Sequence, residues 1–288
     1  MKVGIAGLGR MGSGMANTLL RNNVDVFGYD INRKAMDKFK SSAHFIAAKN
    51  ISELFSCDYV ILSLPEGNNV IDILKSYKGG SIIMDTTTIS LNELQKILDS
   101  LGDYKSNYLS CKLEKGPQEA NEGKLALFLG GDEQLYIKSL EILNILGNPM
   151  YIGTHYQATM MKLISNMIGT AVVDIFGEMS VLIRKLGIDP KIATGALSMG
   201  GANSITQMFR LEWQSKDEFG EAFSMELAQH VIEMALESAR DLGVSSLHLI
   251  EQNNLMMKLA KNMGFGSKDV AEISKLYWNL NDSDNHLR

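Results

Sequence analysis

The chain opens with a glycine pattern that could hold the phosphates of a dinucleotide. An apolar stretch at residues 2–6 runs directly into residues 7–12, which have the form G-x-G-x-x-G, and apolar residues then follow at helical spacing. A diphosphate needs a tight turn, a backbone that approaches without a Cβ in the way, and free N–H groups at a helix N-terminus. Because this pattern alone is a weak signal, the prediction depends on the elements around it.

An acidic residue, Asp30, ends the second apolar stretch, residues 24–30. It follows Gly12 at close to the spacing of roughly 20 residues at which an acid binds the adenosine ribose hydroxyls. The alternative is that Asp30 only caps a helix that begins near Lys34. A carboxylate here would repel a 2′-phosphate, which favours NAD, whereas Arg33 is the one nearby feature that favours NADP.

A second candidate for chemistry lies in the long apolar stretch at residues 157–186. Lys162 and Asn166 are four residues apart and would share one face of a helix. Burial among apolar residues lowers the pKa of a lysine toward the range that is useful for proton transfer. The alternative is that both side chains lie on a narrow solvent-facing stripe, and the spacing alone does not decide between the two.

The elements that would position these residues form an α/β pattern up to residue 154. Four apolar stretches, each followed by a helical pattern, predict a Rossmann-type, doubly wound parallel sheet. Ligands bind such sheets beyond the carboxyl ends of the strands, so Leu64-Pro65 and residues 86–88 should share an edge with the glycine turn. The four stretches are residues 2–6, 24–30, 59–65 and 81–85.

Further strands are predicted at residues 108–113, 124–131 and 150–152, after which the pattern becomes helical throughout. The sequence therefore predicts a dinucleotide-binding domain at residues 1–154 and an all-α domain for substrate binding and oligomerisation at residues 155–288. The helix at residues 157–186 is apolar nearly all round, which predicts burial between domains or subunits. The polar tail at residues 282–288 is expected to fray.

The composition argues against several classes of partner. The formal net charge of −5 provides no global basic field for nucleic acid or an anionic membrane, although a local basic pocket stays open. Cys57 and Cys111 are far apart and in no metal-like spacing, so we expect neither a disulfide framework nor a metal site. With an apolar strand from Lys2 and no run of about 18 apolar residues, we expect a cytoplasmic protein without a signal peptide or membrane span.

Several motifs stand in the order and spacing of one known family. Residues 7–16 match G-L-G-x-M-G-x-x-M-A, residues 85–90 resemble D-x-S-T-I-S, and residues 120–131 match A-x-x-G-x-L-x-x-x-x-G-G. Residues 153–166 resemble a segment with a lysine and, four residues later, an asparagine. Together these motifs resemble the β-hydroxyacid dehydrogenase family, which includes 3-hydroxyisobutyrate dehydrogenase and glyoxylate/succinic semialdehyde reductases and is related to 6-phosphogluconate dehydrogenase.

The resemblance implies an oxidoreductase that interconverts a small alcohol and a carbonyl compound by hydride transfer, with NAD or NADP as cofactor. It implies that Lys162 is the general acid/base, that Asn166 orients the substrate in a cleft between the domains, and that the chain forms homodimers or homotetramers. The cofactor contacts predicted from the glycine turn, the acid and these loops are Gly7, Leu8, Gly9, Arg10, Met11, Gly12, Asp30, Asn32, Arg33, Leu64, Pro65 and Thr88.

The predicted substrate loop departs from the family. The family has D-A-P-V-S-G-G, whereas residues 110–116 read Ser-Cys-Lys-Leu-Glu-Lys-Gly. Glu114 stands where the family's serine and glycines cradle a substrate carboxylate, and like charges in a low-dielectric site repel unless a cation intervenes. Lys115 is the candidate cation, and Gly116 is the glycine that is retained. We therefore predict that these three residues contact an amino-bearing, cationic or sugar-like substrate rather than a simple 3-hydroxy acid.

A second departure lies on a late helix, where the family's lysine-aspartate pair is replaced by His230-Val231. His230 could substitute for the lysine or could be an ordinary surface histidine. The two departures leave open a dinucleotide-binding protein without catalysis, acting as a sensor or structural subunit, and an imine reductase on the same scaffold. The presence of Lys162 argues mildly against the imine reductase.

Overall fold

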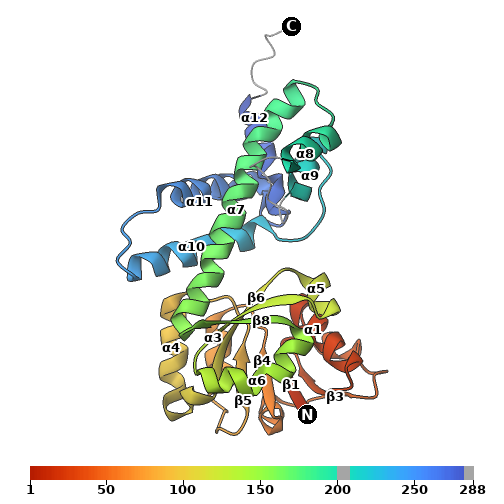
Figure 1. Ribbon diagram of the computed structural model, residues 1–288, viewed down its shortest axis with the longest axis vertical. Coiled ribbons are helices and arrows are strands. Elements are labelled where there is room, and N and C mark those ends of the chain that lie inside the picture. The colour runs from red at the N-terminus through yellow and green to blue at the C-terminus, as the bar shows by residue number, and fades with distance from the viewer. Residues whose placement is uncertain (200–207, 282–288) are drawn as a thin grey trace. The chain divides into compact units, whose positions relative to one another are not determined.

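The computed structural model describes residues 1–199 and 208–281 of the chain (Figure 1). Its contacts divide the chain into two compact units, Met1–Lys162 and Leu163–Arg288. The tail at residues 282–288, which was expected to fray, lies outside the described residues.

The first unit is built on one eight-stranded sheet with the strand order β3-β2-β1-β4-β5-β6-β7-β8. The first six strands pair in parallel, with β1 at the centre between β2 and β4, as the alternating strand and helix pattern predicts. The strands are β1 (Lys2–Ala6), β2 (Asp25–Tyr29), β3 (Phe45–Ala47), β4 (Tyr59–Leu62), β5 (Ile82–Asp85), β6 (Tyr108–Glu114), β7 (Leu125–Gly130) and β8 (Gly147–Gly153).

Two features of the sheet differ from the prediction. β7 runs antiparallel to β6, and β8 pairs in parallel with β7, so the sheet is mostly rather than wholly parallel. The chain between β6 and β7 holds only the short helix α5 (Pro117–Glu122), and a parallel crossover needs a dozen or more residues. The other difference is β3, a short strand in a region predicted as a helix and a return.

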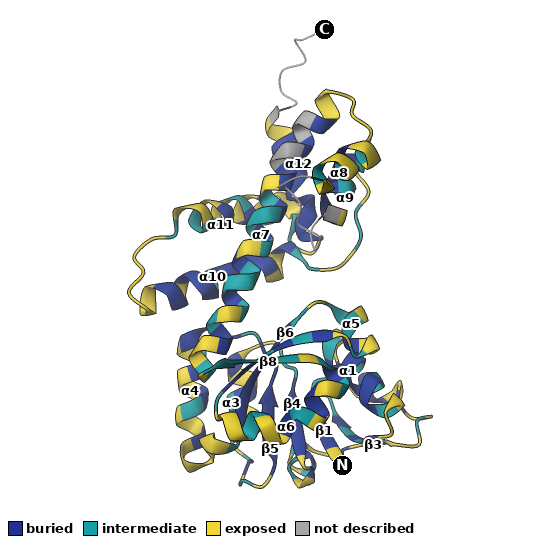
Figure 2. Cartoon of the chain, viewed as in Figure 1, coloured by how far each residue is buried: buried dark blue, intermediate teal, exposed yellow. Residues whose placement is uncertain are grey.

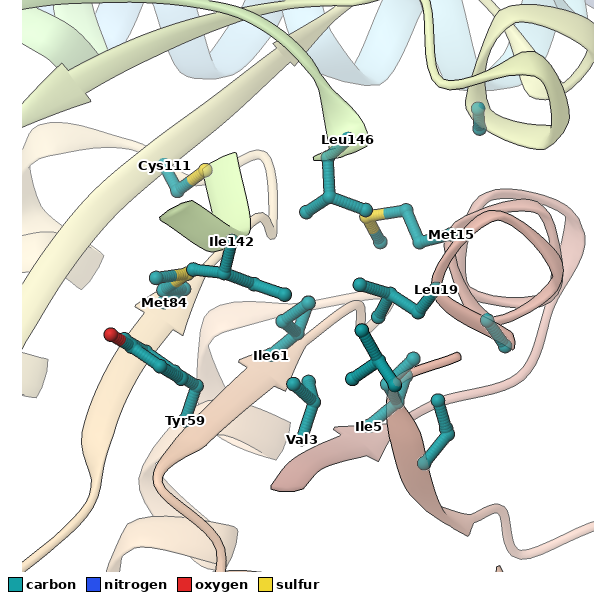
Figure 3. Close-up of a cluster of buried hydrophobic side chains, with 14 of the residues drawn as sticks. Val3, Ile5, Met15, Leu19, Tyr59, Ile61, Met84, Cys111, Ile142 and Leu146 are labelled. Atoms are coloured by element: carbon teal, nitrogen blue, oxygen red, sulfur yellow. The ribbon is translucent and has the colours of Figure 1, made fainter. Parts of the chain in front are cut away.

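Helices cover both faces of the sheet. Figure 3 shows one of the two cores, where apolar side chains of the central strands meet Met15 and Leu19 of α1 and Ile142 and Leu146 of α6. The opposite core lies between the sheet and helices α3 and α4, with Leu94 and other apolar side chains fully buried. The helices are α1 (Arg10–Arg21), α2 (Arg33–Asp37), α3 (Gly67–Leu74), α4 (Leu91–Leu101) and α6 (Glu133–Leu146), with 3₁₀ turns η1 (Ile51–Ser56) and η2 (Gly102–Asn107).

Helix α7 (His155–Lys185) confirms the long helix predicted at residues 157–186. Its first turns belong to the first unit, since Met160 packs against the core beside α3 and α4. The boundary between the units therefore falls after Lys162 rather than after residue 154.

The second unit is helical throughout its described residues, apart from one isolated bridge between Ser224 and Asp269. This arrangement agrees with the predicted all-α domain. Its core is formed mainly by α10, α11, α12 and one side of α7. Its other elements are α8 (Pro190–Ser198), α9 (Met208–Lys216), α10 (Met225–Asp241), α11 (His248–Ala260), a π-helical turn η3 (Lys261–Phe265), a 3₁₀ turn η4 (Val270–Glu272) and α12 (Ile273–Asn281).

Buried, partly exposed and exposed residues alternate along α7 (Figure 2). Ile168 is 60% exposed and Ile175 is 55% exposed, so the burial between domains or subunits that the composition predicts stays a prediction. By length and composition alone, the His155–Gly177 part of this helix could also cross a membrane, with a mean hydropathy of 1.3. One such helix is weak evidence, because core helices of soluble proteins pass the same test.

Candidate active site

The three glycines of the N-terminal turn have different structural reasons for being glycine. Gly7 has φ +89°, and a Cβ on it would overlap the carbonyl oxygen of Ser63. A Cβ on Gly12 would overlap the carbonyl oxygen of Gly7. A Cβ on Gly9, in contrast, would meet no protein atom within 4 Å. Two glycines therefore close the turn, while the third leaves an open space above it.

This open space lies at the N-terminus of α1. Gly9 is the N-cap of the helix and has no side chain to bind the first N–H groups, and the first turn carries no acidic residue. Unpaired N–H groups and the positive end of a helix dipole attract an anion. The turn at residues 7–12 therefore fits the diphosphate of a dinucleotide.

Asp30 lies beside the turn, just after β2. Its Oδ2 accepts a hydrogen bond from the Leu8 N–H at 2.7 Å, and its Oδ1 accepts one from the Asn32 N–H at 2.7 Å. The N-cap of α2 is Asn32, whose side chain accepts from the Lys34 N–H at 3.2 Å. Asp30 is therefore not the helix cap, and each carboxylate oxygen keeps a lone pair that a ribose hydroxyl can use. Arg33 is exposed at the first position of α2.

The loops after β4 and β5 reach the same edge of the sheet. The Leu64 side chain would contact a Cβ on Gly7, and the Leu64 N–H donates to the Thr87 hydroxyl at 3.4 Å. In the two loops, Pro65 follows Leu64 and is exposed, and Thr88 follows Thr87 and is partly exposed. The structure therefore brings the predicted cofactor loops together with the glycine turn, as the rule for carboxyl ends of parallel strands requires.

Strand β6 has one apolar and one polar face, which follow from the alternation of side chains along a strand. Leu109, Cys111 and Leu113 pack into one core of the sheet. On the other face Tyr108, Ser110, Lys112 and Glu114 point toward β5 and the start of α7, where their contacts are made.

Lys112 is a buried cation that the sequence interpretation did not single out. Its side chain is 1% exposed, and its Nζ donates to Asp85 Oδ2 at 3.0 Å and to the Thr87 carbonyl oxygen at 2.7 Å. The Tyr108 hydroxyl donates to the same Asp85 oxygen at 2.7 Å, and burial raises its pKa well above the usual range. The sequence signal for this group of Lys112, Asp85 and Tyr108 is a lysine in the middle of a strand that is predicted to be buried.

His155 is the first residue of α7 and faces this polar side of β6. Its Nδ1 lies 3.4 Å from the Ser110 hydroxyl, and its ring lies 5.5 Å from that of Tyr108. Burial, together with the charge of Lys112, lowers the pKa of His155 to about 4. The imidazole is therefore neutral near pH 7.

Lys162 and Glu114 meet at the end of β6. Lys162 Nζ lies 3.3 Å from Glu114 Oε1, and the two side chains are 14% and 20% exposed. Burial lowers the pKa of Lys162 from its usual value, while the charge of Glu114 acts in the opposite direction. Among the described residues, Oε1 of Glu114 is a buried oxygen without a well-angled hydrogen bond, so it remains able to accept one.

Lys115 does not supply the cation beside Glu114 that its position suggested. Its Nζ donates to the Lys124 carbonyl oxygen at 2.9 Å, and its backbone has φ +73°. The Gly116 N–H donates to the Glu119 carboxylate at 3.0 Å. The cation that faces Glu114 comes from α7 instead, at Lys162.

Asn166 follows Lys162 by one turn of α7, so the two share a face of the helix as their spacing predicts. Asn166 is partly exposed, and its carbonyl oxygen accepts from the Thr170 hydroxyl at 2.9 Å. In the second unit, His230 lies exposed on α10, while Val231 is buried.

In the part of the chain that the structure describes, no group of three or more histidine, cysteine or acidic side chains is placed to hold a metal ion. Cys57 and Cys111 are free and buried. Burial raises the pKa of the Cys57 thiol to about 11 and that of the Cys111 thiol to about 12. Neither thiol is therefore ionised at neutral pH.

Comparison with protein families matches both halves of the chain. Residues 2–160 match the NAD binding domain of 6-phosphogluconate dehydrogenase. Residues 157–277 match the model described as NAD-binding of NADP-dependent 3-hydroxyisobutyrate dehydrogenase.

Similar curated proteins are named reductases and dehydrogenases. The chain is 26% identical to glyoxylate/succinic semialdehyde reductase 2 of Arabidopsis thaliana, over 95% of this chain and 78% of that protein. It is also 26% identical to 2-hydroxy-3-oxopropionate reductase of Escherichia coli, over 92% of this chain and 93% of that protein.

Solved structures share the fold. A 3-hydroxyisobutyrate dehydrogenase of Salmonella typhimurium superposes with a TM-score of 0.84 at 22% identity, covering 96% of this chain and 99% of that one. An imine reductase from Pseudomonas gives a TM-score of 0.62 at 18% identity, covering 95% and 98%. At these identities the likeness concerns the fold alone.

Proposed function

Since the chain belongs to the β-hydroxyacid dehydrogenase family, we propose that it interconverts a small alcohol and its carbonyl compound with Lys162 as the proton-transferring group. The family makes it an NAD(P)-dependent oxidoreductase that acts on CH–OH groups. A bound nicotinamide cofactor supplies or accepts the hydride in such a reaction.

The observation that supports this role is the amine of Lys162 in a mostly buried position beside Glu114. Burial lowers the pKa of the lysine, which brings it closer to the pH at which an amine can both give and take a proton. In reduction, Lys162 donates a proton to the carbonyl oxygen, and in oxidation it accepts the hydroxyl proton. Asn166, on the same face of α7, would hold the substrate by hydrogen bonds.

We further propose NAD as the preferred cofactor, with NADP as the alternative. Asp30 places a carboxylate beside the glycine turn, where it suits ribose hydroxyls and opposes a 2′-phosphate. Arg33 lies three residues after Asp30 and is exposed, and its positive charge would favour NADP.

The substrate proposed for this site is not a simple 3-hydroxy acid. Glu114 presents a carboxylate at the position where the family's loop receives a substrate carboxylate, and Lys162 is the cation near it. When Lys162 is neutral, an anionic substrate would face Glu114 without compensation. An amino-bearing, cationic or sugar-like carbonyl compound suits this arrangement better.

The test starts with fluorescence titrations of NADH and NADPH, followed by a screen for loss of absorbance at the nicotinamide band. The screen includes carboxylated aldehydes such as glyoxylate and succinic semialdehyde, uncharged aldehydes, amino-aldehydes and imines. We expect NADH to bind more tightly than NADPH, and turnover to be fastest with the uncharged or amino-bearing aldehydes. Lys162→Met should lower turnover by about 100-fold or more, because general acid–base catalysis contributes roughly that much.

The control is Lys96→Met, which removes an exposed lysine from α4 and should leave turnover unchanged. NADH affinity should stay within about threefold in both variants, since neither lysine lies in the glycine turn. Full turnover by Lys162→Met would remove this lysine from the mechanism. Cofactor binding without turnover across the whole panel would instead favour a dinucleotide-binding sensor or structural subunit.

A further inference from the structure

Glu114 is positioned by the strand that precedes it. It is the last residue of β6, and the alternation along β6 places it on the same face as Ser110 and Lys112. β6 pairs with β5 up to Ser110 and with β7 as far as Glu114, which lies opposite Ala126, so the ladder with β7 fixes the backbone at Glu114. The backbone that carries the Glu114 carboxylate is therefore held in place by the sheet.

The other ionisable side chains near the polar face of β6 have other partners or carry no charge near pH 7. Lys112 pairs with Asp85, and Lys115 binds the Lys124 carbonyl oxygen. Burial and the charge of Lys112 hold the pKa of His155 at about 4, so this ring carries no charge near pH 7. The Tyr108 hydroxyl stays protonated because burial and Asp85 raise its pKa. Of the described side chains, Glu114 is thus the charged group in contact with the Lys162 amine.

We propose that Glu114 is the positioning residue of Lys162: its carboxylate holds the lysine side chain at the end of β6 and keeps the amine protonated to higher pH. This inference rests on the proposed role of Lys162 as the proton-transferring group. Without the carboxylate, a mostly buried amine would lose its proton at lower pH. Glu114 therefore extends the pH range in which the lysine can act as an acid.

The step that depends on this proton is the reduction of the carbonyl group. The carbonyl carbon accepts a hydride, which a bound reduced nicotinamide would supply while being oxidised, the C=O π bond breaks, and the oxygen takes a proton from the Lys162 ammonium. The products are an alcohol and a neutral amine, which regains its proton from water. Glu114 exchanges no proton in this sequence and acts only through its charge and position.

The ion pair of Lys162 and Glu114 determines how the rate of reduction should change with pH. Reduction needs the protonated amine, so its rate falls as pH rises through the pKa of Lys162. Removing the charge of Glu114 lowers that pKa, so the alkaline limb of the reduction profile should move to lower pH. Oxidation needs the neutral amine, so its acid limb should move in the same direction. An opposite charge at this distance shifts a pKa by about one unit or more.

The experiment measures kcat/KM for reduction of an uncharged aldehyde at saturating NADH, between pH 6 and pH 10, in wild type and Glu114→Gln. Glutamine keeps the shape of the side chain and removes its charge. We expect the alkaline limb to move down by about one pH unit. The matched control is Glu122→Gln, which removes the carboxylate of an exposed pair with Lys124 and should leave the limb in place.

A second measurement reads the amine without turnover. Acetic anhydride acylates only unprotonated amines, and mass spectrometry of the Lys162 peptide across pH gives the titration midpoint of that lysine. We expect the midpoint to be lower by about one unit in Glu114→Gln and unchanged in Glu122→Gln. An unmoved midpoint and an unmoved limb in Glu114→Gln would overturn the inference.

The two proposals fail in different ways. If Lys162→Met turns over substrate as fast as wild type, the proposed function is wrong, whatever the labelling shows. If Lys162→Met is inactive and Glu114→Gln has both the pH profile and the labelling midpoint of wild type, the proposed function stands and only the role of Glu114 is wrong.

Discussion

At the scale of single residues, the glycine turn shows that identical residues can be required for different reasons. Gly12 is needed because of a close approach within the protein, where a Cβ would overlap the Gly7 carbonyl oxygen. Gly9 is not needed by the protein itself, since a Cβ there would meet open space. A ligand that approaches the backbone at this point would account for this glycine.

This difference predicts opposite behaviour of two alanine variants. Gly12→Ala should lose about 1–3 kcal/mol of folding stability through overpacking, which lowers the midpoint of thermal unfolding. Gly9→Ala should unfold at the wild-type temperature and raise the Kd for NADH by about tenfold or more, because the methyl group occupies the diphosphate space. Thermal melts and fluorescence titrations check both. Wild-type NADH affinity in Gly9→Ala would place the diphosphate elsewhere.

At the scale of elements, β6 connects the cofactor loops with the site of Lys162. Lys112 binds the Thr87 carbonyl oxygen in the loop after β5, while Glu114, two residues on, meets α7. The polar face of β6 therefore contacts both the loop after β5 and the first turns of α7. The pairing of β5 with β6 places Asp85 beside Ser110, within reach of Lys112.

The prediction for this element concerns the buried pair of Lys112 and Asp85. Lys112→Met leaves the Asp85 carboxylate buried without its cation, and the free energy of unfolding should fall by about 3 kcal/mol or more. Denaturant unfolding measures the loss. The double variant Lys112→Met/Asp85→Asn should recover part of it, because no charge then stays unpaired. Lys124→Met, which breaks an exposed pair, should change stability little.

Apart from the short β3, the strands and the glycine turn were predictable because their signals are local. The buried pair was not, since Lys112 and Asp85 meet only through the register of β5 and β6. The position of Lys115 was not predictable either, because its φ of +73° turns the side chain toward Lys124, and positive φ is not expected for lysine. The antiparallel direction of β7, in contrast, could have been inferred, because the chain between β6 and β7 is too short for a parallel crossover.

At the scale of the whole molecule, the two units share α7 as a continuous helix. The change from an alternating to an all-helical pattern predicted an α/β part followed by a helical part, whereas the boundary between the units lies eight residues later than predicted. It could not say which sides of α7 are covered, since an apolar helix surface looks the same whether its partner is the same chain or another. Among the exposed apolar side chains of α7 that the structure describes, Ile168 and Ile175 are the two most exposed, and they lie two helical turns apart.

These two residues predict the assembly. If the chain forms homodimers or homotetramers through α7, light scattering at micromolar concentration should give a multiple of 31.8 kDa. Ile168→Glu/Ile175→Glu should then give the monomer, because two charges would be buried in an apolar interface. Ile137→Glu, a change at another exposed isoleucine, should leave the mass unaltered. A monomeric wild type would show that the apolar surface serves another purpose.

The two-faced strand β6 also limits how this part of the chain can vary. Side chains alternate with a period of two, so deleting one residue ahead of Lys112 would turn Lys112 and Glu114 into the apolar core and bring Cys111 and Leu113 to the polar side. Two charges would lose their partners at once. Substitutions along the strand can be absorbed one position at a time, whereas a change of length cannot. Natural variants of this enzyme should therefore differ here in residue type and keep the number of residues.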